Sequence, residues 1–265
     1  MTDTPTGLAS LPQQNVLVKV EDGIAWVTLN RPSKRNAFNP GIVFEMVQVM
    51  DVLEMEESAR CVVITGAGDA FSAGQDLKEY FREMDAGPPI LRERLYRANA
   101  AWQWRRMMHY PKPTIAMVNG WCFGGAFQVL LACDLAVADE DATFGLSEIN
   151  WGIIPGGVVS WNVVQALNTR DAMFYAITGD TFDGKQAAKM GLVNYSVPKD
   201  QLKEETLKLA RRLAQKNPAT LRYTKEGIRA VRGMTEAQAQ DYLAAKSDAL
   251  RFVDREGGRE ESLKQ

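Results

Sequence analysis

The 265-residue sequence predicts an α/β fold in which a largely parallel sheet precedes a helical C-terminal region. In the first two-thirds, short runs rich in β-branched residues alternate with segments whose apolar residues recur at helical spacing. From about residue 158 the pattern is mostly helical. We therefore expect a core over residues 1–198, beginning with a loose arm at 1–14, and helices over 199–265 that pack on a neighbouring subunit.

The strands are expected first in a hairpin at residues 16–20 and 24–29, joined by the turn sequence Glu21-Asp22-Gly23. Buried strands are expected at 61–65, 114–118 and 134–138, with a short apolar run at 192–197. Pro40 is typical of a first helical residue, and Asp76 of a helix cap. Helices are expected at 40–57, from 77 onward, at 90–108, and then at 158–167, 170–177, 184–190, 199–215, 218–231 and 235–253.

Composition excludes several classes of function. With 46% hydrophobic and 24% charged residues, the chain is ordinary for a globular protein, and its net charge of −2 gives no electrostatic case for nucleic acid or an anionic membrane. No apolar run approaches the ~20 residues that span a bilayer, and the first fifteen residues lack the pattern of a signal peptide. These observations predict a cytoplasmic protein.

The counts of histidine and cysteine restrict the chemistry. The single histidine, His109, excludes a multi-histidine zinc site and argues against Ser-His or Cys-His catalysis; we expect it at a helix end. An odd count of three cysteines argues against a disulfide framework and indicates buried thiols. Acid–base work is therefore left to carboxylates, tyrosines, lysines or the backbone.

The stretch 119–157 combines bare backbone with one carboxylate. A strand leads into glycines that include Gly124 and Gly125, and an apolar run follows, which predicts N–H groups free to bind a negative oxygen at a helix start. Glu148 lies further on, among apolar residues and glycines. We expect donors near Gly125 and the carboxylate of Glu148 to share one pocket. In contrast, Gly66-Ala67-Gly68 does not predict a dinucleotide site, because Phe71 stands where the third glycine would fall.

Four motifs together resemble the crotonase superfamily, also called the enoyl-CoA hydratase/isomerase family. They occur in the family's order and spacing over about residues 15–255. The first motif is Leu29-Asn30-Arg31-Pro32 with Asn36-Ala37, and the second is Thr65-Gly66 with Phe71-Ser72-Ala73-Gly74-Gln75-Asp76-Leu77. The third is Asn119-Gly120 with Gly124-Gly125-Ala126 and Cys133-Asp134, and the fourth is Phe144-Gly145 with Glu148 and Gly152-Ile153-Ile154-Pro155-Gly156-Gly157. Each motif alone is weak. Four in register are a strong signal.

The resemblance implies a ββα-spiral core, a helical C-terminal trimerisation region, and trimers paired into hexamers. It also implies an acyl-CoA thioester substrate whose carbonyl oxygen accepts hydrogen bonds from the backbone N–H groups of Gln75 and Gly125. Such preorganised donors stabilise an enolate where its charge develops. Lys34 is expected to contact CoA phosphate, with the backbone of Ala73 and Leu77 near the adenine.

Within this family the chain is most similar to the hydroxycinnamoyl-CoA hydratase-lyase branch, which includes feruloyl-CoA hydratase-lyase. Ordinary hydratases use two carboxylates, but here the first position carries Gln128, which cannot exchange a proton. The branch uses one glutamate, here Glu148, to hydrate the double bond and then cleave the product to an aromatic aldehyde and acetyl-CoA. The resemblance implies no metal and no cofactor beyond the CoA moiety.

The resemblance also assigns the acyl pocket. Tyr80 is expected near the aryl hydroxyl, and the remaining substrate contacts are expected from Ser147, Trp151 and Gly156. Apolar neighbours such as Ile149 and Trp151 are expected to raise the pKa of Glu148.

Four positions depart from the branch pattern. Gln75 replaces a methionine, Ala126 a glycine and Gln128 a serine, and Ala244 stands where a second aryl-binding tyrosine is expected, with Tyr242 nearby. Two alternatives follow. One is a plain enoyl-CoA hydratase or isomerase acting through Glu148. The other is a non-catalytic crotonase-fold protein recruited to RNA, which Glu148 and the lack of a basic stripe disfavour.

Overall fold

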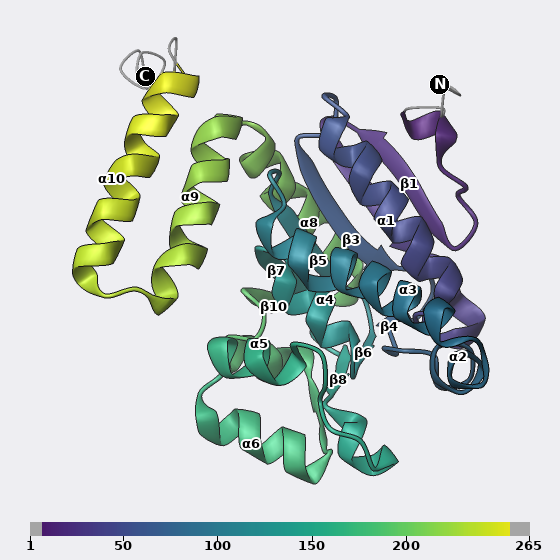
Figure 1. The fold of residues 1–265 in the computed structure, drawn as a ribbon. Coiled ribbons are helices and arrows are strands. Elements are labelled where there is room, and N and C mark those ends of the chain that lie inside the picture. The colour runs from purple at the N-terminus through teal and green to yellow at the C-terminus, as the bar shows by residue number, and fades with distance from the viewer. Residues whose placement is uncertain (1–6, 255–265) are drawn as a thin grey trace.

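Two β-sheets organise the chain, of which the computed structural model describes residues 7–254 (Figure 1). The larger sheet has the strand order β1-β2-β3-β5-β7-β10 and the smaller one the order β4-β6-β8-β9. The strands are β1 (Val16–Glu21), β2 (Ile24–Leu29), β3 (Cys61–Gly66), β4 (Ala70–Ser72), β5 (Thr114–Val118), β6 (Trp121–Phe123), β7 (Leu135–Asp139), β8 (Thr143–Gly145), β9 (Thr181–Asp183) and β10 (Tyr195–Val197).

The larger sheet is mostly parallel, as the sequence predicts. Only β1 and β2 pair antiparallel, as the expected hairpin, while β2, β3, β5, β7 and β10 run parallel. Successive side chains of a strand face opposite sides, so both faces of this sheet must be covered. In β3, Val62 and Ile64 face one apolar cluster while Cys61 and Val63 face another.

The helices confirm nearly every predicted segment. They are α1 (Pro40–Met55), α2 (Glu83–Ala86), α3 (Pro89–Ala100), α4 (Ala126–Ala132), α5 (Val159–Ala166), α6 (Thr169–Thr178), α7 (Gly184–Lys189), α8 (Lys199–Ala214), α9 (Pro218–Ala230) and α10 (Glu236–Val253). A π-helical segment, Ala101–Arg106, and a 3-10 turn continue α3 to His109, which ends the helix as expected. Asp76 caps the π-helical turn Leu77–Arg82 by accepting the N–H groups of Lys78 and Glu79.

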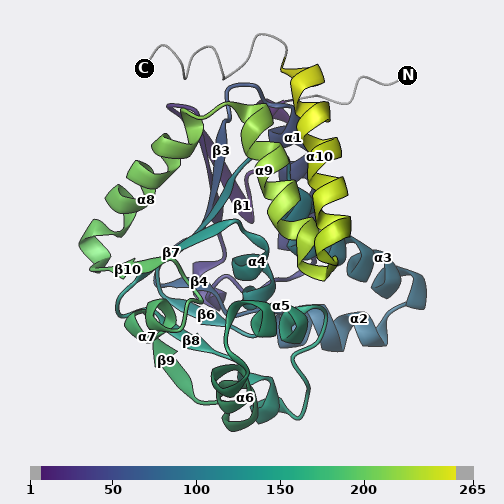
Figure 2. The same cartoon turned by 90° about the vertical axis from the view of Figure 1, so that its left-hand side faces the viewer.

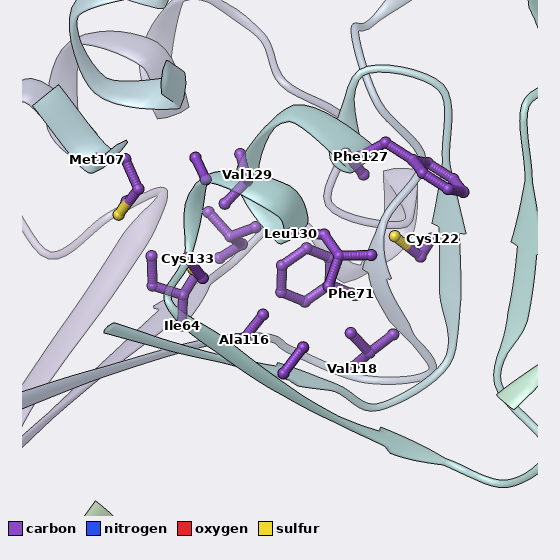
Figure 3. Close-up of a cluster of buried hydrophobic side chains, with 14 of the residues drawn as sticks. Ile64, Phe71, Met107, Ala116, Val118, Cys122, Phe127, Val129, Leu130 and Cys133 are labelled. Atoms are coloured by element: carbon purple, nitrogen blue, oxygen red, sulfur yellow. The ribbon is translucent and has the colours of Figure 1, made fainter. Parts of the chain in front are cut away.

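Helix α4 packs over the larger sheet where the two sheets meet. Figure 3 shows this part of the main core, in which Phe71 of β4 lies between α4 and the strands. The side chains involved include Phe127, Val129 and Leu130 of α4, Ile64 of β3, and Ala116 and Val118 of β5. This packing fixes the position of α4, and therefore of the glycine turn that precedes it.

The C-terminal helices divide into two groups. Helix α8 covers the opposite face of the larger sheet, where Leu202 and Ala210 are buried against the strands of its own chain (Figure 2). Helices α9 and α10 form a pair at the side of the core (Figure 1). Lys225 and Arg229 attach α9 to the core through Asp134, at 2.6 and 3.1 Å. Packing of residues 199–265 on a neighbouring subunit therefore stays a prediction for α9 and α10, but α8 belongs to the core.

Residues 7–14 are not a loose arm, in contrast to the expectation for residues 1–14. Leu8–Ser10 form a 3-10 turn, and Leu11 is buried in the main core. The side chain of Gln13 accepts the N–H of Val18 at 2.8 Å, which attaches the segment to β1. Residues 1–6 of the predicted arm, and 255–265 of the predicted tail, lie outside the described residues. Within the described part, no helix is both long and apolar enough to span a membrane.

Asn36 connects the loop after β2 to the β3–β4 connection. Its fully buried side chain accepts the N–H of Arg31 at 2.9 Å and donates to the carbonyls of Ala67 and Ala70 at 2.9 and 2.7 Å. Its φ of 53° lies in the left-handed region, which asparagine tolerates better than most residues. The loop carrying Lys34 is therefore held directly against the segment that leads to Gln75.

We expect Asn36→Ala to lower the free energy of unfolding by about 3 kcal/mol, because three backbone groups, one buried and two partly buried, lose their partners. Urea unfolding followed by circular dichroism measures this change. The control is Asn30→Ala, which removes one exposed hydrogen bond to the carbonyl of Gln14 and is expected to cost less than about 1 kcal/mol. An equal decrease in the free energy of unfolding in the two variants would contradict the role assigned to Asn36.

Candidate active site

Three short parallel strands of the smaller sheet bring the site together. Strands β4, β6 and β8 are neighbours and run parallel, so their carboxyl ends meet at one edge of that sheet. Gln75 follows the end of β4, Gly125 the end of β6 and Glu148 the end of β8, each by two or three residues. Residues far apart in the sequence therefore converge because each is carried at the same point of a repeated strand–strand–helix unit.

The turns of Gln75 and Gly125 are in direct backbone contact. A Cβ atom added at Gly74 would lie 2.9 Å from the backbone nitrogen of Gly125 and 2.7 Å from the carbonyl oxygen of Phe123. Gly74 has a φ of +81°, so both the space and the backbone conformation require glycine. Among residues 7–254, neither the N–H of Gln75 nor that of Gly125 donates a hydrogen bond. The pair is free to bind one oxygen.

Glu148 lies beside this pair, on the 3-10 turn Ser147–Trp151. Its side chain is 7% exposed, and a Cβ atom added at Gly124 would lie 3.6 Å from its Oε1. Its Oε2 has no hydrogen-bond partner among the described residues. Burial raises the pKa of the Glu148 carboxyl, as expected. However, Ile149 and Trp151 are 48% and 63% exposed and therefore do not enclose the carboxylate.

A cavity of about 1420 Å³ connects these groups. It is large enough for a bulky ligand, since sites for small molecules commonly measure about 300–1,000 Å³. All ten of the site residues expected from the sequence line it: Lys34, Ala73, Gln75, Leu77, Tyr80, Gly125, Ser147, Glu148, Trp151 and Gly156. The structure thus brings every one of them to a single cavity.

The loop after β2 places its three cations in different environments. Arg31 is partly buried and pairs with Asp76 at 3.1 Å and Glu79 at 2.7 Å, which holds the turn after Gln75. Lys34 is exposed and lines the cavity. Arg35 also lines the cavity, with its guanidinium carbon 3.9 Å from the ring centroid of Trp121. Lys34 and Arg35 are therefore the cations of this loop that a bound anion can reach.

Helix α3 contributes a wall of the cavity that the sequence did not predict. Tyr96 and Asn99 line it, and the Tyr96 ring centroid lies 5.8 Å from that of Tyr80. Gln103, one turn beyond Asn99, is fully buried. The available signal was two carboxamides at i and i+4 on the apolar face of an amphipathic helix, a pattern that is costly without a partner.

The positions that depart from the branch pattern fall into two groups. Gln128 on α4 is 5% exposed, lines the cavity, and has no partner for its Oε1 in the described part of the chain. Ala244 and Tyr242 lie on α10, and neither lines this cavity. Among the described residues, Tyr80 and Tyr96 therefore line the cavity, whereas no residue of α10 does.

The cysteines are free and buried, as expected. Burial is the main cause that raises the pKa of the Cys61 and Cys133 thiols to about 12 and also raises the pKa of the Cys122 thiol. Thiols in this state are poor nucleophiles at neutral pH. None of the three cysteines lines the cavity, which agrees with the expectation that acid–base work does not fall to a thiol.

The fold and the convergent site define a class of CoA-thioester enzymes, and the comparisons with known proteins agree. The chain belongs to the enoyl-CoA hydratase/isomerase family, whose model matches residues 19–264. A hydroxycinnamoyl-CoA hydratase-lyase from Pseudomonas fluorescens is 55% identical over 252 residues, covering 95% of this chain and 91% of that protein. The 2,3-dehydroadipyl-CoA hydratase of Escherichia coli K12 is 32% identical, with 81% of each chain covered.

Solved structures agree at the level of the fold. An enoyl-CoA hydratase from Bacillus anthracis superposes with a TM-score of 0.84 at 26% sequence identity, covering 95% of each chain. These findings confirm the crotonase superfamily expected from the sequence motifs.

Burial of Glu148 predicts a pH-dependent stability. Its pKa is higher in the folded than in the unfolded chain, so folding loses stability as pH rises from the unfolded value, about 4.3, through the raised one. The Glu148→Gln variant has no ionisable group at this position and therefore does not lose this stability as the pH rises. We expect the variant to be more stable than wild type at pH 7 and equally stable at pH 3.5, as measured by urea unfolding.

The control is Glu45→Gln, at a carboxylate that is 8% exposed. Glu45 accepts the N–H groups of Asn15 and Val16 at 2.8 and 3.0 Å, so this variant is expected to lose about 2 kcal/mol at pH 7. A Glu148→Gln variant that is destabilised at pH 7 would contradict the assignment of an uncompensated buried charge.

Proposed function

We propose that the chain hydrates a 4-hydroxycinnamoyl-CoA, such as feruloyl-, coumaroyl- or caffeoyl-CoA, and cleaves the product to an aromatic aldehyde and acetyl-CoA. The observation that carries the proposal is one buried carboxylate, Glu148, beside two free backbone donors, with a carboxamide at Gln128. The 55% identity to a hydroxycinnamoyl-CoA hydratase-lyase supports the lyase reaction.

In the first step, the thioester carbonyl oxygen accepts hydrogen bonds from the N–H groups of Gln75 and Gly125. Glu148 removes a proton from water, whose oxygen bonds to the β-carbon while the π electrons move toward the carbonyl. The resulting enolate oxygen is stabilised by the two donors. Protonated Glu148 then gives its proton to the α-carbon, and the β-hydroxyacyl thioester is complete.

In the second step, Glu148 removes the proton of the new hydroxyl group. The C–O bond becomes the aldehyde C=O, the Cα–Cβ bond breaks, and its electron pair forms the enolate of acetyl-CoA at the same two donors. The proton on Glu148 returns to that carbon. A carboxyl group whose pKa is raised toward neutrality suits this alternation, because it must both accept and donate the proton.

The CoA moiety is assigned to the part of the cavity near the loop after β2. Lys34 is proposed to pair with phosphate, and the backbone of Ala73 and Leu77 to lie near the adenine. Ser147, Trp151 and Gly156 are proposed to contact the acyl part, and Tyr80 the aryl hydroxyl. The sequence of steps requires no cofactor beyond the CoA moiety of the substrate, because the developing charge is stabilised by backbone donors.

We also propose a cytoplasmic homotrimer or a hexamer of two trimers. Large apolar side chains that are more than 40% exposed support a subunit interface, since exposed apolar surface of this kind marks association sites. They lie on α5, α6, α9 and α10: Trp161, Val164, Met173, Phe174, Ile177, Ile228 and Leu243.

The test is incubation of the purified protein with feruloyl-CoA while aldehyde and acetyl-CoA are quantified. Both products are expected in equal amounts. Accumulation of hydrated thioester alone, or much faster turnover of crotonyl-CoA, would reject the lyase assignment in favour of a plain hydratase.

Glu148→Gln tests the assigned base. We expect kcat to fall by about 10²–10⁴-fold, because general acid–base transfer is lost, while binding of the CoA ester persists. Glu140→Gln, a carboxylate paired with Lys185 outside the lining of the cavity, is the control and should keep wild-type activity. Near-normal turnover by Glu148→Gln would eliminate the proposed role.

A further inference from the structure

A cluster of three carboxamides lies behind the oxyanion donors. The side chain of Gln75 donates from Nε2 to Oε1 of Gln103 at 3.2 Å, and Asn99 donates from Nδ2 to the same oxygen at 3.1 Å. Gln103 is fully buried and Asn99 is 4% exposed. One acceptor on the helix that continues α3 therefore anchors the side chain of the residue whose backbone N–H is an oxyanion donor.

The other end of the Gln75 side chain contacts the second donor residue. A Cβ atom added at Gly125 would lie 1.6 Å from Gln75 Oε1 and 2.5 Å from its Cδ, so the carboxamide rests on the Cα atom of Gly125. The two donors come from separate turns, after β4 and after β6. The Gln75 side chain spans the gap between them.

Burial is costly for this cluster. Asn99 Oδ1 and Gln103 Nε2 have no hydrogen-bond partner within residues 7–254. A buried polar atom without a partner typically costs about 1–3 kcal/mol. Reversing all three amides would keep both hydrogen bonds and again leave one donor and one acceptor unpaired, so this cost does not depend on their assigned orientation. Stability alone does not account for the cluster.

We propose that Gln103, held by Asn99, is a positioning residue that sets the separation of the two oxyanion donors through the side chain of Gln75. The inference rests on the proposed function for the use of these donors. When the anchor is lost, the Gln75 carboxamide no longer presses on Gly125, and the two N–H groups move out of register with the enolate oxygen. Oxyanion stabilisation is sensitive to such displacement, since a misplacement of about 1 Å can cost ~10²-fold in rate.

The direct test uses acetoacetyl-CoA, whose α-protons are acidic because they lie between two carbonyl groups. Its enolate and keto forms differ in ultraviolet absorbance, so the bound fraction of enolate reports on the strength of the donor pair without any hydration or cleavage. We expect Gln103→Met and Asn99→Leu to shift the bound equilibrium about 10-fold or more toward the keto form. With feruloyl-CoA, kcat should fall about 10- to 100-fold with KM little changed.

The matched control is Asn162→Leu on α5. Asn162 is also 4% exposed and has an unpaired Nδ2 in the described part of the chain, but it does not line the cavity. This variant should leave the enolate fraction unchanged. Wild-type enolate fractions in both Gln103→Met and Asn99→Leu, or an equal shift in Asn162→Leu, would overturn the proposal.

A double-mutant cycle tests whether Gln103 acts through Gln75. In a Gln75→Met background the carboxamide is absent, so adding Gln103→Met should cause no further shift in the enolate fraction. A full additional shift would show that Gln103 acts by another route and would overturn the proposal. The outcome is separable from the proposed reaction, since a protein that failed to cleave feruloyl-CoA would still report its donor geometry through acetoacetyl-CoA.

Discussion

The parallel pairing of β4, β6 and β8 is the constraint on which the site depends. Each strand has only three residues, so the main-chain hydrogen bonds of the smaller sheet cannot hold these ends in place alone. Their position is fixed by burial, since Phe71, Cys122 and Phe144, one from each strand, all lie in the main core. The donor pair and Glu148 are therefore positioned by the apolar packing beneath them.

Two features of the site lower the stability of the folded chain. Within residues 7–254, Glu148 carries a buried charge without an ion-pair partner, whereas Glu45, buried to nearly the same degree, accepts backbone donors. The carboxamides of Asn99 and Gln103 also have atoms without a hydrogen-bond partner in the described part of the chain. Such costs are tolerated where a preorganised polar environment lowers the energy of a transition state, and the large hydrophobic core around them supplies the compensating stability.

The sequence predicted the strands of the larger sheet and most helices because the spacing of apolar residues within each of these segments indicates its secondary structure. It did not predict β4, β6, β8 and β9, because three residues are too few to show alternation. The glycines and the single carboxylate of residues 119–157 predicted a shared pocket for Gly125 and Glu148, and the motif resemblance added Gln75. Periodicity does not predict the contact between Gln75 and Gln103, because it joins the turn after β4 to the π-helical segment Ala101–Arg106, two segments far apart in the sequence.

With Gln128 in place of the second carboxylate expected of an ordinary hydratase, Glu148 is the one buried carboxylate among the described residues that line the cavity, since Asp76 and Glu93 line it without being buried. If a carboxylate occupied that position, like-charge repulsion would raise the pKa of one group further, and the two would divide the roles of acid and base. With one buried carboxyl group beside the donor pair, the proposed reaction uses the same atoms to accept and return the proton in both steps. Hydration followed by cleavage suits this arrangement, because each step begins with removal of a proton from oxygen and ends with its transfer to the α-carbon. The neutral amides are therefore as important to the proposed reaction as the carboxylate itself.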